Sequence, residues 1–289
     1  MKIKNTIHYF ATIATLFLKT YAQPDPNFHI YLAFGQSNME GQGSVSNTSK
    51  EYKTANSRFL HLQSADCKGH SKGNWKVAVP PLAHVDAGYG LVDAFGRKLI
   101  RKLPEEIKVG ATVVAVSGCN IHAFDKTNYD YYVNEITKEN YFQKRMGYYG
   151  RYPYGRLIEM GKEAKKVGVI KGILLHQGEN NSGEKEWPNY VKNIYENILK
   201  DLNLNGDEVP LLVGEVIHSE MGGSAGKHNE IINKIPKYIP NSYVISSKGL
   251  SPRRCYESNK EKDCVHFSDE GYIILGERYA DKMLEILSK

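Results

Sequence analysis

The chain has 289 residues, with 38 basic and 32 acidic residues and a formal net charge of +6. Three of the lysines lie in residues 1–22, which hold no acidic residue, so the rest of the chain carries 35 basic against 32 acidic residues, a surplus of +3. So small a surplus gives little reason to expect a nucleic-acid partner.

The N-terminal segment is typical of a secretory signal peptide. A basic start precedes an apolar run at about 10–18, and Thr20-Tyr21-Ala22 supplies the small residues that predict cleavage before Gln23. The apolar run is too short to span a bilayer by itself, which disfavours the alternative of a retained anchor. We therefore expect residues 1–22 to be removed and the mature protein to be secreted, periplasmic or extracellular, without stable membrane insertion.

Residues 23–289 suit one domain, because single α/β domains commonly reach this length. The chain has four cysteines, and export favours disulfides, for which four cysteines allow three pairings. We favour Cys255–Cys264, which are close in sequence and bracket a charged loop, and Cys67–Cys119 would then follow. Free thiols are the alternative, and the spacing does not resemble a zinc site.

Short apolar runs alternate with amphipathic stretches along the mature chain. The runs predict five strands and the stretches predict four helices, and such alternation favours a parallel sheet covered on both faces. The sequence therefore predicts an α/β fold with a five-stranded, mainly parallel sheet. The predicted strands are 28–34, 111–116, 170–175, 210–216 and 243–246, and the predicted helices are 91–103, 153–167, 187–202 and 268–287.

A candidate nucleophile follows the first predicted strand. Ser37 lies in Gly35-Gln36-Ser37-Asn38-Met39, at the carboxyl end of the strand, where sheets of this type bind ligands. A serine hydroxyl is a weak nucleophile at neutral pH and needs a base within hydrogen-bond reach. The alternative interpretation is a solvated turn residue or a helix cap.

The candidate base is His266, just before the last predicted helix. Asp263 precedes it by three residues, close enough to hold one imidazole nitrogen, fix the tautomer and stabilise the imidazolium. The alternative is a surface histidine that caps the helix.

Several groups could stabilise an oxyanion on the substrate. They are the backbone N–H of Ser37, the backbone N–H of Gly118 after the second strand, and the side-chain amide of Gln177 after the third, to which Asn120 could add another. Gly118 could equally be an ordinary strand-to-loop turn.

His176 and Glu179 could be read as metal ligands, but two ligands without a third at metal spacing favour a role in bracing the site by hydrogen bonds. We expect no metal and no cofactor.

These motifs, Gly35-Gln36-Ser37-Asn38-Met39, His176-Gln177-Gly178-Glu179 and Asp263-x-x-His266, resemble those of the SGNH-type carbohydrate esterases, the group that holds acetylxylan esterases and sialate O-acetylesterases. The resemblance runs from about Phe28 to the C-terminal helix. It implies the SGNH-hydrolase (flavodoxin-like) fold, a three-layer α/β/α sandwich, and metal-independent removal of acetyl groups from sugars.

The resemblance also implies residue roles. Ser37 matches the nucleophile, His266 the base, Asp263 its partner, and Gly118 and Gln177 the oxyanion donors. Glu179 matches a buried support, with a direct role on His266 as the alternative, and the other supporting residues are Gln36, Asn38 and Asn120. The chain departs from the pattern at Asn180-Asn181, where relatives usually carry a small residue and an aspartate, and in Ser117-Gly118-Cys119-Asn120, where a second glycine or a threonine is usual.

Residues 129–154 hold eight tyrosines, whose flat rings with a polar tip suit sugar faces, although most should pack the segment onto the domain. Arg145, Arg151 and Arg156 in the same region could meet acidic sugars or could cover surface with their stems.

The sequence predicts a secreted serine acetylesterase acting on acetylated plant polysaccharide or oligosaccharide, with acetylxylan favoured. The alternatives are a sialate O-acetylesterase, a general short-chain esterase, and a non-catalytic carbohydrate-binding protein on the same fold.

Overall fold

A computed structural model describes residues 23–66, 71–136, 140–254 and 262–289, so the predicted signal peptide lies outside the described residues. Seven strands form one mixed sheet in the order β3-β2-β4-β1-β5-β6-β7. All neighbouring pairs are parallel except β2 and β3. The strands are β1 Phe28–Gly35, β2 Phe59–Leu62, β3 Trp75–Val77, β4 Lys108–Ala115, β5 Val169–His176, β6 Leu211–Gly214 and β7 Ser242–Ile245.

The prediction of five strands was wrong in number, because β2 and β3 extend the sheet beyond β4. Both are very short, and β2 reads Phe-Leu-His-Leu while β3 reads Trp-Lys-Val, so neither has an apolar run that stands out. The five predicted strands are all present. Their order, β4-β1-β5-β6-β7, is the flavodoxin-like order 2-1-3-4-5 when they are numbered along the chain.

The four predicted helices are confirmed to within two residues at their ends. They are α2 Leu91–Lys102, α5 Pro153–Lys165, α6 Trp187–Leu202 and α8 Asp269–Leu287. The shorter α-helices are α1 Ser37–Glu40, α3 Tyr129–Tyr131, α4 Asn140–Gly147 and α7 Asn229–Ile232. Single turns of other helix types are η1 Lys50–Tyr52, η2 Ile121–Phe124, η3 Tyr132–Ile136, η4 Glu179–Asn181, η5 Ser219–Met221, η6 Gly226–His228 and η7 Ile235–Lys237.

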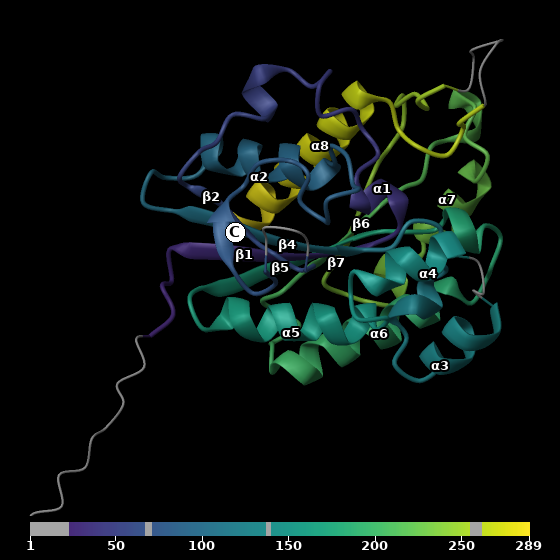
Figure 1. Cartoon of the computed structure of the whole chain (residues 1–289), viewed down its shortest axis with the longest axis horizontal. Helices are drawn as coiled ribbons and strands as arrows, with labels where there is room; N and C mark the ends of the chain where they lie inside the picture. Colours follow the sequence, from purple (N-terminus) through teal and green to yellow (C-terminus); the bar gives the residue numbers. More distant parts are fainter. Residues whose placement is uncertain (1–22, 67–70, 137–139, 255–261) are drawn as a thin grey trace, which may run out of the picture.

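The sheet is covered on both faces, as the apolar strands require (Figure 1). Helices α2 and α8 lie on one face, and α5 and α6 lie on the other. Successive residues of β1 point to opposite faces, so Tyr31 belongs to the cluster under α2 and α8 while Leu32 belongs to the cluster under α5 and α6. Burial on both faces explains why the central strands read as continuous apolar runs.

The last helix is fixed at its start and along its length. Ser268 Oγ accepts a hydrogen bond from the Gly271 N–H at 3.1 Å, and Asp269 and Glu270 occupy the first turn, where carboxylates favour the positive helix end. Farther along, Gly276 lets α8 approach α2 so closely that a Cβ there would lie 2.1 Å from the Leu91 carbonyl oxygen.

The cysteine prediction is wrong in one pairing. Cys119 is a buried free thiol in the core cluster, donating to the Gly35 carbonyl at 3.6 Å, so it forms no bridge to Cys67. Burial raises the pKa of this thiol well above its usual value. Cys67 and Cys255 lie outside the described residues, so the Cys255–Cys264 bridge stays a prediction.

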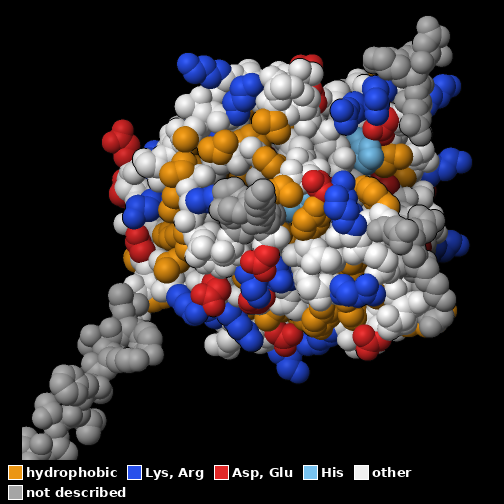
Figure 2. Space-filling model, viewed as in Figure 1, with side chains coloured by type: hydrophobic (Ala, Val, Ile, Leu, Met, Phe, Trp, Pro, Cys, Tyr) orange, Lys and Arg blue, Asp and Glu red, His pale blue; other side chains and the backbone are white. Residues whose placement is uncertain are grey.

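The surface in view mixes charges of both signs. On the face drawn in Figure 2, Lys and Arg side chains alternate with Asp and Glu and do not gather in one patch. Within the described ranges, no helix combines the length and the apolar character needed to cross a bilayer.

The contact between α2 and α8 yields a stability prediction. Gly276→Ala would force the two helices apart, and overpacking of this kind typically costs about 1–3 kcal/mol, or roughly 2–4 °C in Tm for each kcal/mol. Thermal unfolding should show this loss. Gly147→Ala is the matched control, since Gly147 is also helical but a Cβ there has no atom within 4 Å. Equal Tm values for the two variants would contradict the close approach.

Candidate active site

Three neighbouring parallel strands deliver polar residues to one edge of the sheet. Ser37 follows β1, Ser117 and Gly118 follow β4, and Gln177 to Asn180 follow β5; β4, β1 and β5 are adjacent. A cavity of about 400 Å³ opens at this edge. Its lining consists of Gln36, Ser37, Gln42, Ser117, Gly118, Tyr141, Glu179, Asn180, Lys262, Asp263, Val265 and His266.

A sharp turn between β1 and α1 sets the position of Ser37. Gly35 has φ +152°, and a Cβ on it would lie 2.0 Å from the His176 carbonyl oxygen, so only glycine fits. The next residue, Gln36, donates its N–H to that carbonyl at 3.1 Å. Ser37 then opens the four-residue α1, with its side chain in the cavity wall.

Ser37, His266 and Asp263 form a continuous hydrogen-bonded series. His266 Nε2 lies 2.8 Å from Ser37 Oγ, and His266 Nδ1 lies 2.9 Å from Asp263 Oδ2. The second oxygen, Asp263 Oδ1, accepts the backbone N–H of His266 at 3.0 Å. Because the carboxylate can only accept, Nδ1 carries the imidazole proton and Nε2 turns its lone pair to the serine.

The environment keeps Asp263 ionised. Partial burial alone would raise the pKa of its carboxyl group, but the hydrogen bonds and the charge of His266 outweigh burial, so the pKa is lowered from its usual value. The aspartate therefore remains a charged partner for an imidazolium.

Asn38 holds both sides of His266. Its Nδ2 donates to the Val265 carbonyl at 2.9 Å, and its Oδ1 accepts from the Phe267 N–H at 3.3 Å and from the Tyr272 hydroxyl at 2.7 Å. The residue next to the nucleophile thus fixes the loop that carries the histidine.

Glu179 supports this clamp, not the histidine itself. It accepts a second hydrogen bond from Asn38 Nδ2, whereas Asp263 occupies His266 Nδ1. Burial by itself would raise the pKa of Glu179. The interaction with His176, whose Nε2 lies 3.6 Å away, and the Asn38 hydrogen bond lower this pKa by more than burial raises it, so the net shift is downward. The carboxylate is buried and ionised.

Gly118 is placed to serve as a hydrogen-bond donor to the cavity. It has φ +75°, it is exposed, and a Cβ on it would have no neighbour within 4 Å, so open space lies against its backbone. Within the described part of the chain, its N–H has no hydrogen-bond partner. The Ser37 N–H, at the first position of a helix, is likewise one of the donors that a helix leaves unused.

The structure does not bring Gln177 and Asn120 into the cavity. Gln177 is fully buried; its Nε2 donates to Gln36 Oε1 at 3.0 Å, and its Oε1 accepts from Trp187 Nε1 at 2.6 Å. Asn120 Oδ1 accepts the His122 N–H at 3.1 Å and so caps η2. The side-chain amides that do line the cavity belong to Gln36, Gln42 and Asn180, and Asn180 Nδ2 donates to the Gly118 carbonyl at 2.6 Å.

The tyrosine-rich segment contributes one ring to the site. Of its eight tyrosines, all within the described residues, Tyr141 lines the cavity, and it is exposed. Five others are buried or partly buried against the core, as expected for most of them: Tyr129, Tyr132, Tyr148, Tyr149 and Tyr154. Arg156 is bound to Ser64 and Glu159, and Arg145 is bound to Glu40, so both guanidinium groups already have partners.

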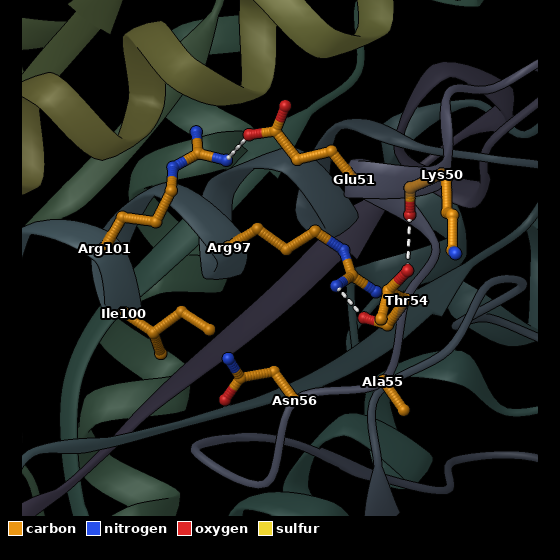
Figure 3. A pocket seen from close by; sticks show the side chains of 8 residues that line it. All are labelled: Lys50, Glu51, Thr54, Ala55, Asn56, Arg97, Ile100 and Arg101. Carbon is orange, nitrogen blue, oxygen red and sulfur yellow. Dashed lines mark hydrogen bonds and ion pairs between the residues drawn. The ribbon is translucent and has the colours of Figure 1, made fainter.

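A second hollow, of about 440 Å³, is lined by η1, the segment 54–56 that follows it, and α2 (Figure 3). The arginines in its wall are engaged within it: Arg97 donates to the Thr54 carbonyl, and Arg101 donates to Glu51 at 2.7 Å. None of Ser37, His266 and Asp263 lines it, so it is separate from the candidate site.

Sequence reasoning missed three residues of this wall and its support, Glu40, Gln42 and Lys262, and it named Asn180 only as a departure from the family pattern. The sequence carried no signal for the role of Glu40, because the burial of its four-residue helix, which makes partners for the charge necessary, is seen only in the folded structure.

An α/β sheet with a serine, a histidine and a carboxylate in hydrogen-bonded series at its carboxyl edge defines the structural class of the α/β serine hydrolases. The chain belongs to the family described as carbohydrate esterase, sialic acid-specific acetylesterase, whose model matches residues 27–285.

A sequence relative and several solved structures resemble the chain along most of its length. The chain is 25% identical over 276 residues to the "Probable carbohydrate esterase At4g34215" of Arabidopsis thaliana, covering 88% of this chain and 89% of the relative. The crystal structure of that plant protein gives a TM-score of 0.64 at 22% identity, over 90% of this chain and 99% of the plant one.

Two further structures share the fold. NanS gives a TM-score of 0.65 at 16% identity, over 92% of this chain and 99% of NanS. A carbohydrate acetylesterase from Xanthomonas citri, XAC1771, gives 0.56 at 17% identity, over 87% of this chain but 55% of the larger neighbour.

The Asn38 clamp yields a pH-dependent prediction. Asn38→Asp would set a second carboxylate against buried Glu179, which raises the pKa of the pair in the folded state. A raised carboxyl pKa means that stability is lost as the pH rises through it. We expect the Tm deficit relative to the unmodified protein to be clearly larger at pH 8 than at pH 5, as measured by thermal unfolding.

Asn38→Ala is the control for this experiment, because it removes the same amide without adding charge. Its Tm deficit should change much less between the two pH values. A deficit for Asn38→Asp that is the same at pH 5 and pH 8 would show that the two carboxyl groups are not coupled.

Proposed function

We propose that this chain is a serine carbohydrate acetylesterase that works through an acetyl-enzyme on Ser37. The observation that carries the proposal is the unbroken series from Asp263 through His266 to Ser37, with contacts of 2.9 and 2.8 Å, inside a cavity at the sheet edge. Membership in a carbohydrate esterase family supports an ester substrate on a sugar.

In the first half-reaction, Ser37 Oγ attacks the acetyl carbonyl carbon and gives its proton to His266 Nε2. The tetrahedral intermediate collapses, the bond to the sugar oxygen breaks, and His266 returns the proton to that oxygen. In the second half-reaction, a water molecule loses a proton to His266 and attacks the acetyl group, and acetate leaves as Ser37 Oγ regains the proton. Asp263 stabilises the imidazolium in both halves.

The oxyanion donors in this proposal are the N–H groups of Ser37 and Gly118, which have no hydrogen-bond partner among the described residues and belong to residues of the cavity wall. The Gln177 amide, predicted as a third donor, would first have to leave Gln36 Oε1. We therefore expect the two backbone donors to contribute more than Gln177 does. Because preorganised donors act only when aimed at the developing charge, their geometry matters more than their number.

For the substrate, we propose an O-acetylated glycan, and two classes fit. Acetylated plant polysaccharide, acetylxylan above all, remains the proposal from the sequence, with exposed Tyr141 offering a face for a neutral sugar ring. O-Acetylated sialic acid is the second, supported by the description of the family and by Lys262 in the cavity wall, whose ammonium group could bind a carboxylate. Export of the mature protein after cleavage before Gln23 is part of the same proposal.

The central test is Ser37→Ala. Acetate release from an aryl acetate, acetylxylan and O-acetylated sialic acid should fall by at least about a thousandfold, since loss of a serine nucleophile removes the covalent route. Ser46→Ala, at an exposed serine nearby, should leave the rates unchanged. The ratio of rates on the two glycans separates the substrate classes, and a butyrate ester tests for a general short-chain esterase.

Labelling with a fluorophosphonate checks the same residue directly. It should modify the unmodified protein at Ser37 and leave the alanine variant unlabelled. Retained turnover in Ser37→Ala would refute the nucleophile, whereas sugar binding without labelling or turnover in the unmodified protein would favour a non-catalytic carbohydrate-binding protein.

A second prediction concerns Asp263→Asn. The asparagine amide would present either its NH₂ group or a neutral carbonyl oxygen to His266 Nδ1, and the carboxylate acceptor would be gone. The imidazole would then no longer be held in the tautomer that turns the Nε2 lone pair to Ser37. Removal of this carboxylate in a serine triad costs on the order of 10⁴-fold in kcat. We expect a kcat loss of roughly that size in steady-state assays, with KM little changed. A loss below about tenfold would contradict the role of Asp263.

A further inference from the structure

Glu40, the last residue of α1, is a fully buried carboxylate three residues beyond Ser37. Both of its oxygens accept hydrogen bonds. Oε1 accepts from Ser117 Oγ at 2.9 Å, Arg145 Nη1 at 3.1 Å and Gln42 Nε2 at 3.1 Å. Oε2 accepts from the Ser117 backbone N–H at 2.9 Å and faces His84 Nε2 at 3.3 Å. The catalytic series uses none of these contacts, so the cluster requires its own explanation.

The charge of Glu40 is compensated inside the protein. Arg145 is largely buried and supplies the positive charge. His84 Nδ1 accepts the Asp86 N–H at 3.2 Å, so in the neutral ring the proton is on Nε2, which points to Glu40. A buried carboxylate without such partners would be strongly destabilising, and one with them holds its surroundings in a fixed geometry.

What Glu40 holds is the loop that carries Gly118. The carboxylate binds both the N–H and the hydroxyl of Ser117, the residue directly before Gly118. On the other side, the Gly118 carbonyl accepts from Asn180. The peptide group that presents the Gly118 N–H to the cavity therefore lies between two anchored groups.

We propose that Glu40 is a positioning residue that ties the helix of the nucleophile to the donor loop, so that the Gly118 N–H stays aimed at the oxyanion formed next to Ser37. This inference rests on the proposed function. Because Glu40 and Ser37 share one helical turn, any shift of the serine is passed to the Ser117 loop. A misplacement of about 1 Å in a catalytic group can cost on the order of a hundredfold in rate.

The same carboxylate also joins the substrate wall to this unit. Arg145 comes from α4, and its guanidinium carbon lies 5.1 Å from the centre of the Tyr141 ring, which lines the cavity. The nucleophile turn, the donor loop and the tyrosine wall thus meet at one buried charge.

Glu40→Gln is the sharpest variant, because it keeps the shape and removes the second acceptor. Ser117, Arg145, His84 and Gln42 all act as donors to the carboxylate, so the new amide NH₂ must face a donor in either orientation. The Ser117 loop would then shift while the series Ser37–His266–Asp263 keeps its own contacts.

The experiment compares an aryl acetate with the corresponding aryl thionoacetate, whose C=S sulfur is a poor hydrogen-bond acceptor and gains little from oxyanion donors. In the unmodified protein the oxygen ester should be strongly preferred. Glu40→Gln should lower kcat/KM for the oxygen ester by about 10- to 100-fold and for the thionoester far less, so that the preference shrinks by a similar factor.

Glu215→Gln is the matched control. Glu215 is also a buried carboxylate after a strand, bound by His218, Asn233 and Ser246, but it does not line the cavity. It should lower Tm and leave the preference for the oxygen ester unchanged. If Glu40→Gln does not fold, Ser117→Ala, which removes one of the bonds to Glu40, should reduce the preference in the same direction but less.

Equal losses on both substrates, or no loss, would overturn the positioning role. The proposed function fails separately: if Ser37→Ala retains turnover, the nucleophile is wrong, whatever the ratio for Glu40→Gln. If Ser37→Ala is inactive and the ratio does not change in Glu40→Gln or Ser117→Ala, only the role of Glu40 falls.

Discussion

The whole site depends on the close approach of β1 to β5 at Gly35. With no side chain there, the first strand can end against the His176 carbonyl and turn at once into a helix, which puts Ser37 at the sheet edge. Since β4 and β5 flank β1 as parallel neighbours, the residues that follow them arrive at the same edge without long connections. Any residue with a Cβ at position 35 would separate the strands and move the serine from its partners.

Around this turn lie three carboxylates that are partly or fully buried, and each binds a different group. Asp263 faces the imidazole, Glu179 holds the Asn38 amide, and Glu40 holds the Ser117 loop. Each stays compatible with burial because donors surround it, and each therefore fixes the groups that donate. The site is rigid through this polar network, whereas the sheet beneath it is rigid through apolar packing.

Much of this could be predicted from the sequence, and the failures have physical causes. Strands buried on both faces leave long apolar runs, and the long helices leave amphipathic stretches, so these five strands and four helices could be predicted. Strands β2 and β3 were too short to show a hydrophobic periodicity. The proximity of Ser37, Asp263 and His266 could be predicted because their spacing is local or their motif is distinctive. Glu40, Asn180 and the burial of Gln177 depend on contacts between segments far apart in the chain, which no local pattern encodes. The free thiol of Cys119 was missed for the same reason, since its burial behind β4 is a property of the folded core.

The Tyr272 hydroxyl binds Asn38, and so the last helix reaches the residue beside the nucleophile. During synthesis Ser37 emerges among the first residues of the fold and His266 among the last, so the two can meet only after α8 has docked. On the proposed function, Ser37 would have no base to activate it until the growing chain is nearly complete. An esterase built in this way cannot act on esters before the rest of its structure has formed. Loss of the C-terminal helix would abolish its activity even if the sheet remained folded.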